Sequence, residues 1–126
     1  MIESAIILAG GRGSRLAPWP APKALMPIAG IPIIERLIGH IDGSVGRIVV
    51  CTGYRASDIE AALRRFSGIR FSCAGEDVPM GERLLHARDQ WSITGRALVC
   101  YGDELADVNI VELERQHVSA EAAVTF

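Results

Sequence analysis

Glycines and cationic side chains are interleaved near the start of the chain, in the order Gly10, Gly11, Arg12, Gly13, Arg15 and, after a proline-rich stretch, Lys23. Glycine allows the backbone to approach a ligand closely and to turn its N–H groups toward an anion. Arginine grips phosphate oxygens with paired N–H groups, and lysine acts as a compact point charge. The combination suits a triphosphate, although a Gly-Gly-x-Gly segment alone is equally consistent with a flexible turn that carries solvated basic residues.

The glycine segment departs from two common phosphate-binding patterns. A dinucleotide fingerprint would have a third glycine where this chain has Leu16, and an acid at the end of the second strand, where this chain has Cys51-Thr52-Gly53. A Walker loop would close with Gly-Lys followed by Ser or Thr, and this segment does not. The residues therefore indicate an anion site of another kind.

Asp103 is the carboxylate placed best for chemistry. It follows Gly102 directly after the apolar segment 97–101, which has the pattern of a buried strand. An isolated Gly-Asp pair is more commonly a turn or the start of a helix, and Asp107 is better explained as such a cap. Whether Asp103 has a chemical role thus depends on the strands and helices that position it.

Apolar runs and helical periodicities alternate along the chain. The segments with the pattern of buried strands are 4–8, 47–52, 69–73, 97–101 and 122–126. Helical spacing runs from Ile33 to Ile41, and the capping-box sequence Ser57-Asp58-Ile59-Glu60 opens a second helix. A third helix follows Gly81 and carries Leu84, Leu85 and Trp91 toward the core, and a fourth, capped by Asn109 and Glu112, ends near His117.

This alternation predicts an α/β fold with a parallel sheet and helices on both of its faces. Ligands bind such sheets at the carboxyl ends of the strands. The loops after Leu8, Thr52, Ala74 and Tyr101 are therefore the segments in which a site is expected.

Composition narrows the class of protein. The chain has 126 residues, which predicts a single domain over residues 1–126, and 49% of them are hydrophobic, as in an ordinary globular protein. A net charge of -2 argues against a dedicated nucleic-acid binder. Cys51, Cys73 and Cys100 lie in apolar runs and are interpreted as buried thiols. Without a basic leader or a long apolar run, we expect a cytoplasmic protein that does not associate with membranes.

Two longer stretches resemble the signature of the sugar-phosphate nucleotidyltransferases. They are Leu8-Ala9-Gly10-Gly11-Arg12-Gly13-Ser14-Arg15-Leu16 and the run from Pro22 to Glu35. Thr52-Gly53-Tyr54 also resembles the family, and Met80–Leu84 with Tyr101–Val108 look closest to its glucose-1-phosphate cytidylyltransferase branch. That branch usually has Thr-Gly-Gly-Arg where this chain has Met80-Gly81-Glu82-Arg83, and the connection from Arg15 to Lys23 is about two residues shorter than in sugar pyrophosphorylases. The base and the sugar therefore stay open.

The resemblance implies a Rossmann-like three-layer α/β/α sandwich, here apparently truncated, that transfers NMP from an NTP to a sugar 1-phosphate and releases pyrophosphate. It implies that Arg15 holds the β and γ phosphates, that Lys23 neutralises charge between donor and acceptor, and that Asp103 binds Mg²⁺, which takes hard oxygen ligands beside substrate phosphates. The nucleotide-binding residues that it implies are Leu8, Ala9, Gly10, Gly11, Arg12, Gly13, Ser14, Glu76, Gly81 and Gly102.

Glu76 lies in the loop that faces the nucleobase in relatives. A carboxylate there accepts a hydrogen bond from the exocyclic amine of cytosine or from the N–H edge of guanine, whereas thymine and uracil offer it only a ring N–H. This favours CTP or GTP slightly, with CTP preferred from the resemblance. A solvated loop acid is the alternative interpretation of Glu76.

Two alternative functions stay open. The chain ends at Phe126, before the sugar-binding strands and the second metal-binding aspartate of relatives, and a catalytically incomplete nucleotide-binding or regulatory module would fit that. Similar glycine loops also occur in nucleotidyltransferases whose acceptor is a molybdenum cofactor or a small alcohol phosphate. A terminal strand without a neighbour would leave an exposed edge, so we expect a homo-oligomer or a complementing chain to cover it.

Overall fold

The structure, a computed structural model, describes residues 1–13 and 20–126. Its centre is a parallel sheet of strands β1 (Ser4–Leu8), β4 (Ile48–Thr52), β5 (Ile69–Cys73) and β6 (Ala97–Tyr101). The strand order is β5-β4-β1-β6, so β1 and β4 lie inside the sheet and β5 and β6 form its edges. Every residue of β1 and β4 is buried, as their continuous apolar sequences predict.

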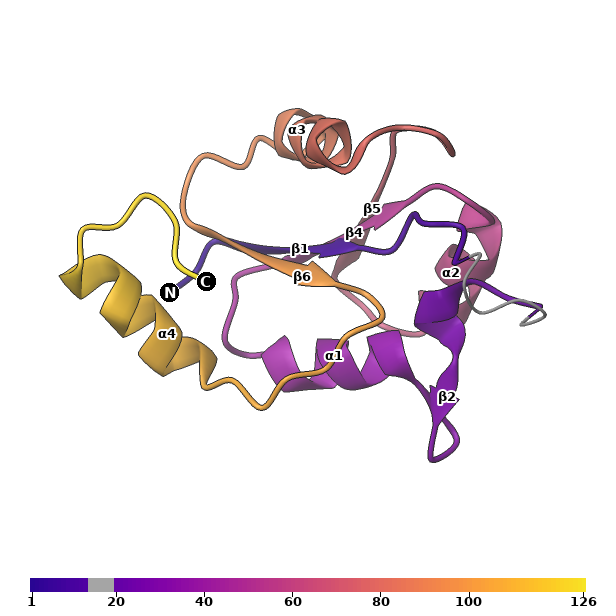
Figure 1. Cartoon of the computed structure of the whole chain (residues 1–126), viewed down its shortest axis with the longest axis horizontal. Helices are drawn as coiled ribbons and strands as arrows, with labels where there is room; N and C mark the ends of the chain where they lie inside the picture. The colour runs from indigo at the N-terminus through magenta and orange to yellow at the C-terminus, as the bar shows by residue number, and fades with distance from the viewer. Residues whose placement is uncertain (14–19) are drawn as a thin grey trace.

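Helices cover both faces of this sheet (Figure 1). Helix α3 (Met80–Gln90) lies on one face, while α1 (Ile33–Ile41), α2 (Ala56–Leu63) and α4 (Ile110–Ser119) lie on the other. Alternate strand residues serve the two faces: Ile7 and Val50 pack in the cluster with α1 and α2, whereas Ile6 and Val49 pack in the cluster with α3. The three-layer α/β/α sandwich predicted from the sequence is confirmed.

The proline-rich stretch after the glycine segment forms small elements of its own. A single 3₁₀ turn, η2, spans Lys23–Leu25, and strands β2 (Pro27–Ile28) and β3 (Ile31–Pro32) form an antiparallel hairpin. The guanidinium of Arg36 in α1 donates to the carbonyl oxygen of Ile28 at 2.9 and 2.7 Å, which fixes the hairpin to the helix. The turn and the hairpin together place Lys23 beside the sheet.

Three sequence predictions about the elements are wrong in detail. Helix α2 begins at Ala56 after Arg55 in a left-handed conformation, so Ser57 lies inside the helix and does not cap it. In α3 the buried residues are Arg83 and Ala87; Leu84 and Trp91 pack against the core as predicted, whereas the side chain of Leu85 is exposed. Segment 122–126 forms no strand, since residues after α4 follow an irregular path.

Other predictions have mixed outcomes. Asn109 caps α4 as expected, because its side chain accepts a hydrogen bond of 3.0 Å from the backbone N–H of Glu112. Of the three cysteines, Cys51 is buried and Cys100 is half-buried, but Cys73 is exposed. The expected partner chain at a sheet edge stays a prediction, and β6 is the edge that presents Val99 and Tyr101 to solvent.

Within the described residues, no helix has the length and apolar character needed to cross a membrane.

Candidate functional site

A cavity of about 670 Å³ opens at the carboxyl ends of β1 and β6, beside the loop that follows β5. The residues that line it come from four segments: Leu8, Ala9, Gly10, Gly11, Gly13, Lys23, Ala24, Glu76, Asp77, Val78, Pro79, Met80, Arg83, Tyr101 and Asp103. Three of the four loops singled out from the sequence are therefore represented. The position agrees with the general rule for ligand sites in parallel sheets.

The glycine segment leaves β1 close to its neighbouring strands. Ala9 donates its backbone N–H to the carbonyl of Cys51 at 2.9 Å, and Gly102 donates to the carbonyl of Leu8 at the same distance. Gly13 has a φ of +63°, which favours glycine, and a Cβ added there would lie 3.1 Å from the Cβ of Lys23. The sequence Gly10 to Gly13 thus allows the loop to turn tightly against the lysine.

Lys23 and Asp103 form an ion pair inside the cavity. Lys23 Nζ lies 2.7 Å from Asp103 Oδ2, with side chains 42% and 26% exposed. Lys23 is the first residue of the turn η2, Asp103 follows the end of β6 by two residues, and Lys23 is the only lysine in the sequence. The pair joins the two segments for which chemistry was predicted.

The donor set at Asp103 fits Mg²⁺ only in combination with a ligand. Nowhere in residues 1–13 and 20–126 do three His, Cys, Asp or Glu side chains gather as a metal site. Mg²⁺ commonly takes one or two carboxylates together with substrate phosphates, and Asp103 supplies one carboxylate that opens on the cavity. The residues present are therefore compatible with a metal bound together with a nucleotide.

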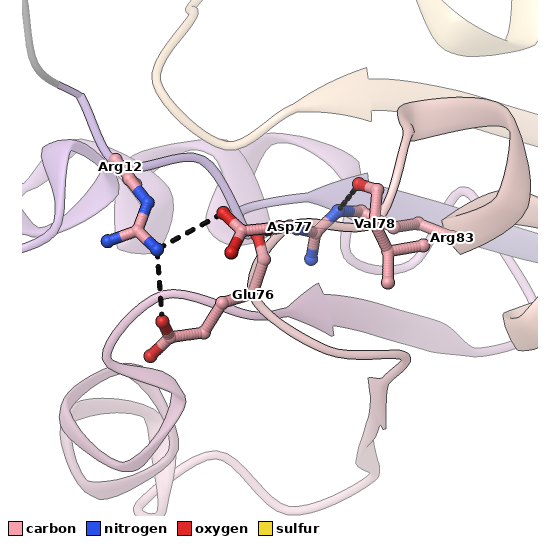
Figure 2. A network of polar contacts seen from close by, with 5 residues as sticks. All are labelled: Arg12, Glu76, Asp77, Val78 and Arg83. Atoms are coloured by element: carbon pink, nitrogen blue, oxygen red, sulfur yellow. Dashed lines mark hydrogen bonds and ion pairs between the residues drawn. The ribbon is translucent and has the colours of Figure 1, made fainter.

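Arg12 crosses to the loop after β5 (Figure 2). Its Nη2 atom lies 3.2 Å from Glu76 Oε2 and 3.1 Å from Asp77 Oδ1, and its guanidinium lies 5.2 Å from the ring centre of Tyr54. The hydrogen bond and the charge of Asp77 raise the pKa of Arg12 above its usual value. Arg12 does not line the cavity; it ties the glycine segment to the loop 76–78.

Arg83 approaches the same loop from inside the protein (Figure 2). It is only 7% exposed, and its guanidinium donates to three backbone carbonyls. Cys51 lies beneath it, with its Sγ 3.9 Å from the Arg83 carbonyl oxygen. Burial raises the pKa of the Cys51 thiol to about 11, although the charge of Arg83 opposes this shift.

The cavity brings together most of the residues predicted from the sequence. Those that line it are Leu8, Ala9, Gly10, Gly11, Gly13, Lys23, Glu76 and Asp103. Gly102 is buried against Ala9, and Gly81 lies in the first turn of α3; neither lines the cavity. Ser14 and Arg15 lie outside the described residues.

Sequence reasoning missed Arg83, Asp77 and Tyr101, which also line the cavity. Arg83 was noticed only as part of the segment Met80-Gly81-Glu82-Arg83, because a lone arginine in a helix is normally exposed. The usable signal was its spacing of four residues from Ala87, which places both side chains on one helix face.

Comparison with known proteins gives a family. The model of the family described as "MobA-like NTP transferase domain" matches residues 5–125. A bifunctional protein GlmU from Methanococcus maripaludis is 34% identical over 111 residues, which are 86% of this chain and 26% of that protein. A mannose-1-phosphate guanylyltransferase from Mycobacterium tuberculosis is 30% identical over 128 residues, 97% of this chain and 36% of that protein. The chain thus spans about a quarter to a third of these curated relatives.

Solved structures have the same fold. A nucleotidyl transferase from Methanothermobacter matches with a TM-score of 0.69 and 29% identity, covering 90% of this chain and 56% of that one. HddC from Yersinia pseudotuberculosis, complexed with GMP-PN, matches with a TM-score of 0.76 and 22% identity, covering 93% of this chain and 55% of that one. The expected nucleotide-diphospho-sugar transferase fold is therefore confirmed, whereas the expected cytidylyltransferase branch is not.

Proposed function

Because the chain belongs to the family of MobA-like NTP transferase domains, we propose that it transfers a nucleotidyl group from an NTP to a sugar 1-phosphate, with release of pyrophosphate. The observation that carries the proposal is the cavity in which a glycine loop, the Lys23–Asp103 pair and the loop 76–78 meet. Relatives that act on sugar phosphates by name, such as the mannose-1-phosphate guanylyltransferase, support the acceptor class.

Transfer of this kind needs no nucleophile from the protein. An oxygen of the acceptor phosphate forms a bond to the α-phosphorus, the bond from that phosphorus to the bridging oxygen breaks, and the bond electrons leave with pyrophosphate. Little covalent work is left to the side chains, so positioning and charge stabilisation dominate. Backbone N–H groups of the glycine loop orient the donor phosphates, and Arg15 is proposed to hold the β and γ phosphates.

Lys23 and Asp103 serve the transferring phosphate. We propose that Lys23 neutralises the negative charge that donor and acceptor bring together, and that Asp103 holds Mg²⁺ beside the α-phosphate. When bound, the ion would supply charge stabilisation of the phosphate oxygens. In the structure Asp103 holds Lys23 within the cavity, so the lysine is already oriented before any ligand arrives.

Glu76 is proposed to read the base, with CTP favoured. Its carboxylate shares Arg12 with Asp77. Arg12 thus retains a carboxylate partner in Asp77 when Glu76 turns toward the amino group of a cytosine. Guanine offers donors to the same carboxylate, which makes GTP the competing substrate.

The test is pyrophosphate release with each of four NTPs and a panel of hexose 1-phosphates in the presence of Mg²⁺. We expect turnover with at least one pair and a loss of about 100-fold or more in Asp103→Asn. Asp89→Asn is the matched control, because Asp89 pairs with Arg88 on the surface and lies outside the cavity. Absence of turnover with every pair, or full activity of Asp103→Asn, would contradict the proposal.

A nucleotide-binding module without turnover is the second candidate. It is favoured by the single carboxylate at the Lys23 end of the cavity in the described part of the chain, which would leave Mg²⁺ loosely held. Titration calorimetry with CTP and GTP separates the two: binding without pyrophosphate release would select the module. Release of pyrophosphate with a small alcohol phosphate but with no sugar 1-phosphate would change the acceptor class instead.

A further inference from the structure

Arg83 is a buried cation without a carboxylate partner among residues 1–13 and 20–126. Its residue exposure is 7%, and no ion pair of the described chain includes it. An arginine is rarely buried unless its N–H groups are satisfied, because removing a guanidinium from water is costly. The groups that accept hydrogen bonds from the Arg83 guanidinium therefore indicate the structural role of this residue.

The partners of Arg83 are main-chain oxygens from two separate segments. Nη1 donates to the carbonyl of Thr52, the last residue of β4, at 3.0 Å. Nη2 donates to the carbonyl of Glu76 at 2.7 Å, and Nε donates to the carbonyl of Val78 at 2.9 Å, the contact drawn in Figure 2. One guanidinium thus joins the end of a central strand to both ends of the loop 76–78.

Two glycines make room for this guanidinium. A Cβ added at Gly10 or at Gly53 would overlap the Nη1 atom of Arg83. Neither glycine has the positive φ that would explain its presence by backbone conformation. Gly10 and Gly53 are therefore best explained by the space that Arg83 needs between the glycine segment and the end of β4.

We propose that Arg83 is a positioning residue that holds the loop 76–78 in a preformed state, so that the loop is ready to receive the nucleoside part of an NTP. The inference rests on the proposed function for the identity of the ligand. Arg12 grips the same loop from outside through the carboxylates of Glu76 and Asp77, whereas Arg83 grips it from inside through the main chain (Figure 2). Only the inner grip is independent of the loop's side chains.

Arg83→Lys is the informative variant, because it keeps the charge but cannot reach three carbonyls in the fork geometry of a guanidinium. Arg88→Lys on the same helix is the matched control, since Arg88 is exposed and pairs with Asp89. The first readout is hydrogen exchange in the ligand-free protein of the amides of residues 77, 78 and 80, together with that of residue 83, whose backbone N–H donates to the carbonyl of Pro79 at 3.1 Å. We expect roughly 10-fold faster exchange in Arg83→Lys, from the weakening of bonds to a charged donor, and no change in the control.

The second readout is the affinity for CTP or GTP compared with pyrophosphate, which has no nucleoside. We expect Arg83→Lys to bind the nucleotide about 10-fold more weakly and pyrophosphate about as well as the unchanged protein. Equal weakening of both ligands, or unchanged exchange of the loop, would overturn the inference. If the unchanged protein binds neither ligand the proposed function fails, and the exchange experiment still decides whether Arg83 orders the loop.

A pair of substitutions covers the case in which Arg83→Lys folds poorly. In the protein that retains Arg83, Gly53→Ala should accelerate hydrogen exchange of the loop amides, because the new methyl group displaces the guanidinium. The same substitution in an Arg83→Ala background should add little, since the conflict is gone. Additive effects of the two changes would show that Gly53 and Arg83 act separately and would contradict the proposal.

Discussion

Removal of the Lys23 side chain should abolish most of the activity and little of the stability. The ion pair with Asp103 is partly solvated, with side chains 42% and 26% exposed. Pairs of this kind stabilise a fold by about 0.2–1 kcal/mol, so we expect Lys23→Ala to lower Tm by only a few degrees.

The catalytic loss should be much larger. Lys23 is one of two cations that line the cavity within the described residues, and the other, Arg83, is engaged with backbone carbonyls. Loss of a preorganised group that stabilises developing charge costs about 100- to 1,000-fold in kcat, or about 2.7–4 kcal/mol. Because the expected catalytic loss is much larger than the expected loss of stability, Lys23→Ala should be folded and nearly inactive.

The assay is steady-state pyrophosphate release together with thermal unfolding of the same samples. Arg96→Ala is the matched control, because Arg96 pairs with Glu114 at 3.0 Å with similar exposures of 48% and 16% and directly precedes β6, at the end of that strand opposite to Asp103. Unchanged kcat in Lys23→Ala, or an equal loss in Arg96→Ala, would refute the reasoning.

A chemical version of this test uses the fact that Lys23 is the only lysine in the sequence. An amine-selective acylating reagent can modify Lys23 and the amino terminus at Met1, whose nitrogen pairs with Glu114 away from the cavity. We expect a bound NTP to protect Lys23 and to leave Met1 unprotected, as measured by mass spectrometry. Equal labelling of Lys23 with and without nucleotide would contradict its place in the site.

Three further predictions concern the scaffold. Asn109→Ala should lower the free energy of unfolding by about 1 kcal/mol in urea titrations, because the side chain caps α4, whereas Asn109→Ser should keep most of it. Of the three thiols, Cys73 should be the one that a disulfide reagent labels quickly at pH 8, since it is exposed while burial raises the pKa of Cys51 to about 11; fast labelling of Cys73→Ser would contradict this. Hydrogen bonds from Arg115 and Gln116 lower the pKa of Glu112 to about 2, so its contribution is present above pH 4.5 and disappears as the pH falls toward 2; the Tm difference between the unchanged protein and Glu112→Gln should shrink over that interval.

The strands were predictable from sequence because both faces of a parallel sheet are covered. Ser4–Leu8 and Ile48–Thr52 carry small or apolar residues at nearly every position, and the structure buries all of them. Helix α1 was predictable for a related reason, since the buried residues of Ile33–Ile41 recur at helical spacing. The position of Asp103 in the cavity was predictable because it lies just beyond the end of β6, whereas Lys23, the first residue of η2, was expected there from the family resemblance.

Backbone conformation and long-range contacts set the details that the sequence patterns missed. Helix α2 starts before Ser57 because Arg55 adopts a left-handed conformation, and the backbone N–H of Asp58 donates to the carbonyl of Arg55 at 3.0 Å with no side-chain cap. Arg83 is buried because carbonyls from two distant segments converge on it, and no local pattern records that convergence. Segment 122–126 has strand-like composition but pairs with no strand in the described structure.

The way Arg83 holds its loop bears on how base preference can change. Carbonyl oxygens are present whatever side chains the loop carries, so the anchor tolerates substitution at positions 76 and 77. If Glu76 reads the base as proposed, its exchange for another hydrogen-bonding residue would alter which base is recognised while the contacts of Arg83 with the loop's main chain stay in place. A loop held by its main chain can change its base preference through side-chain substitutions while it keeps its position. The same property would allow the loop to be redesigned for another base.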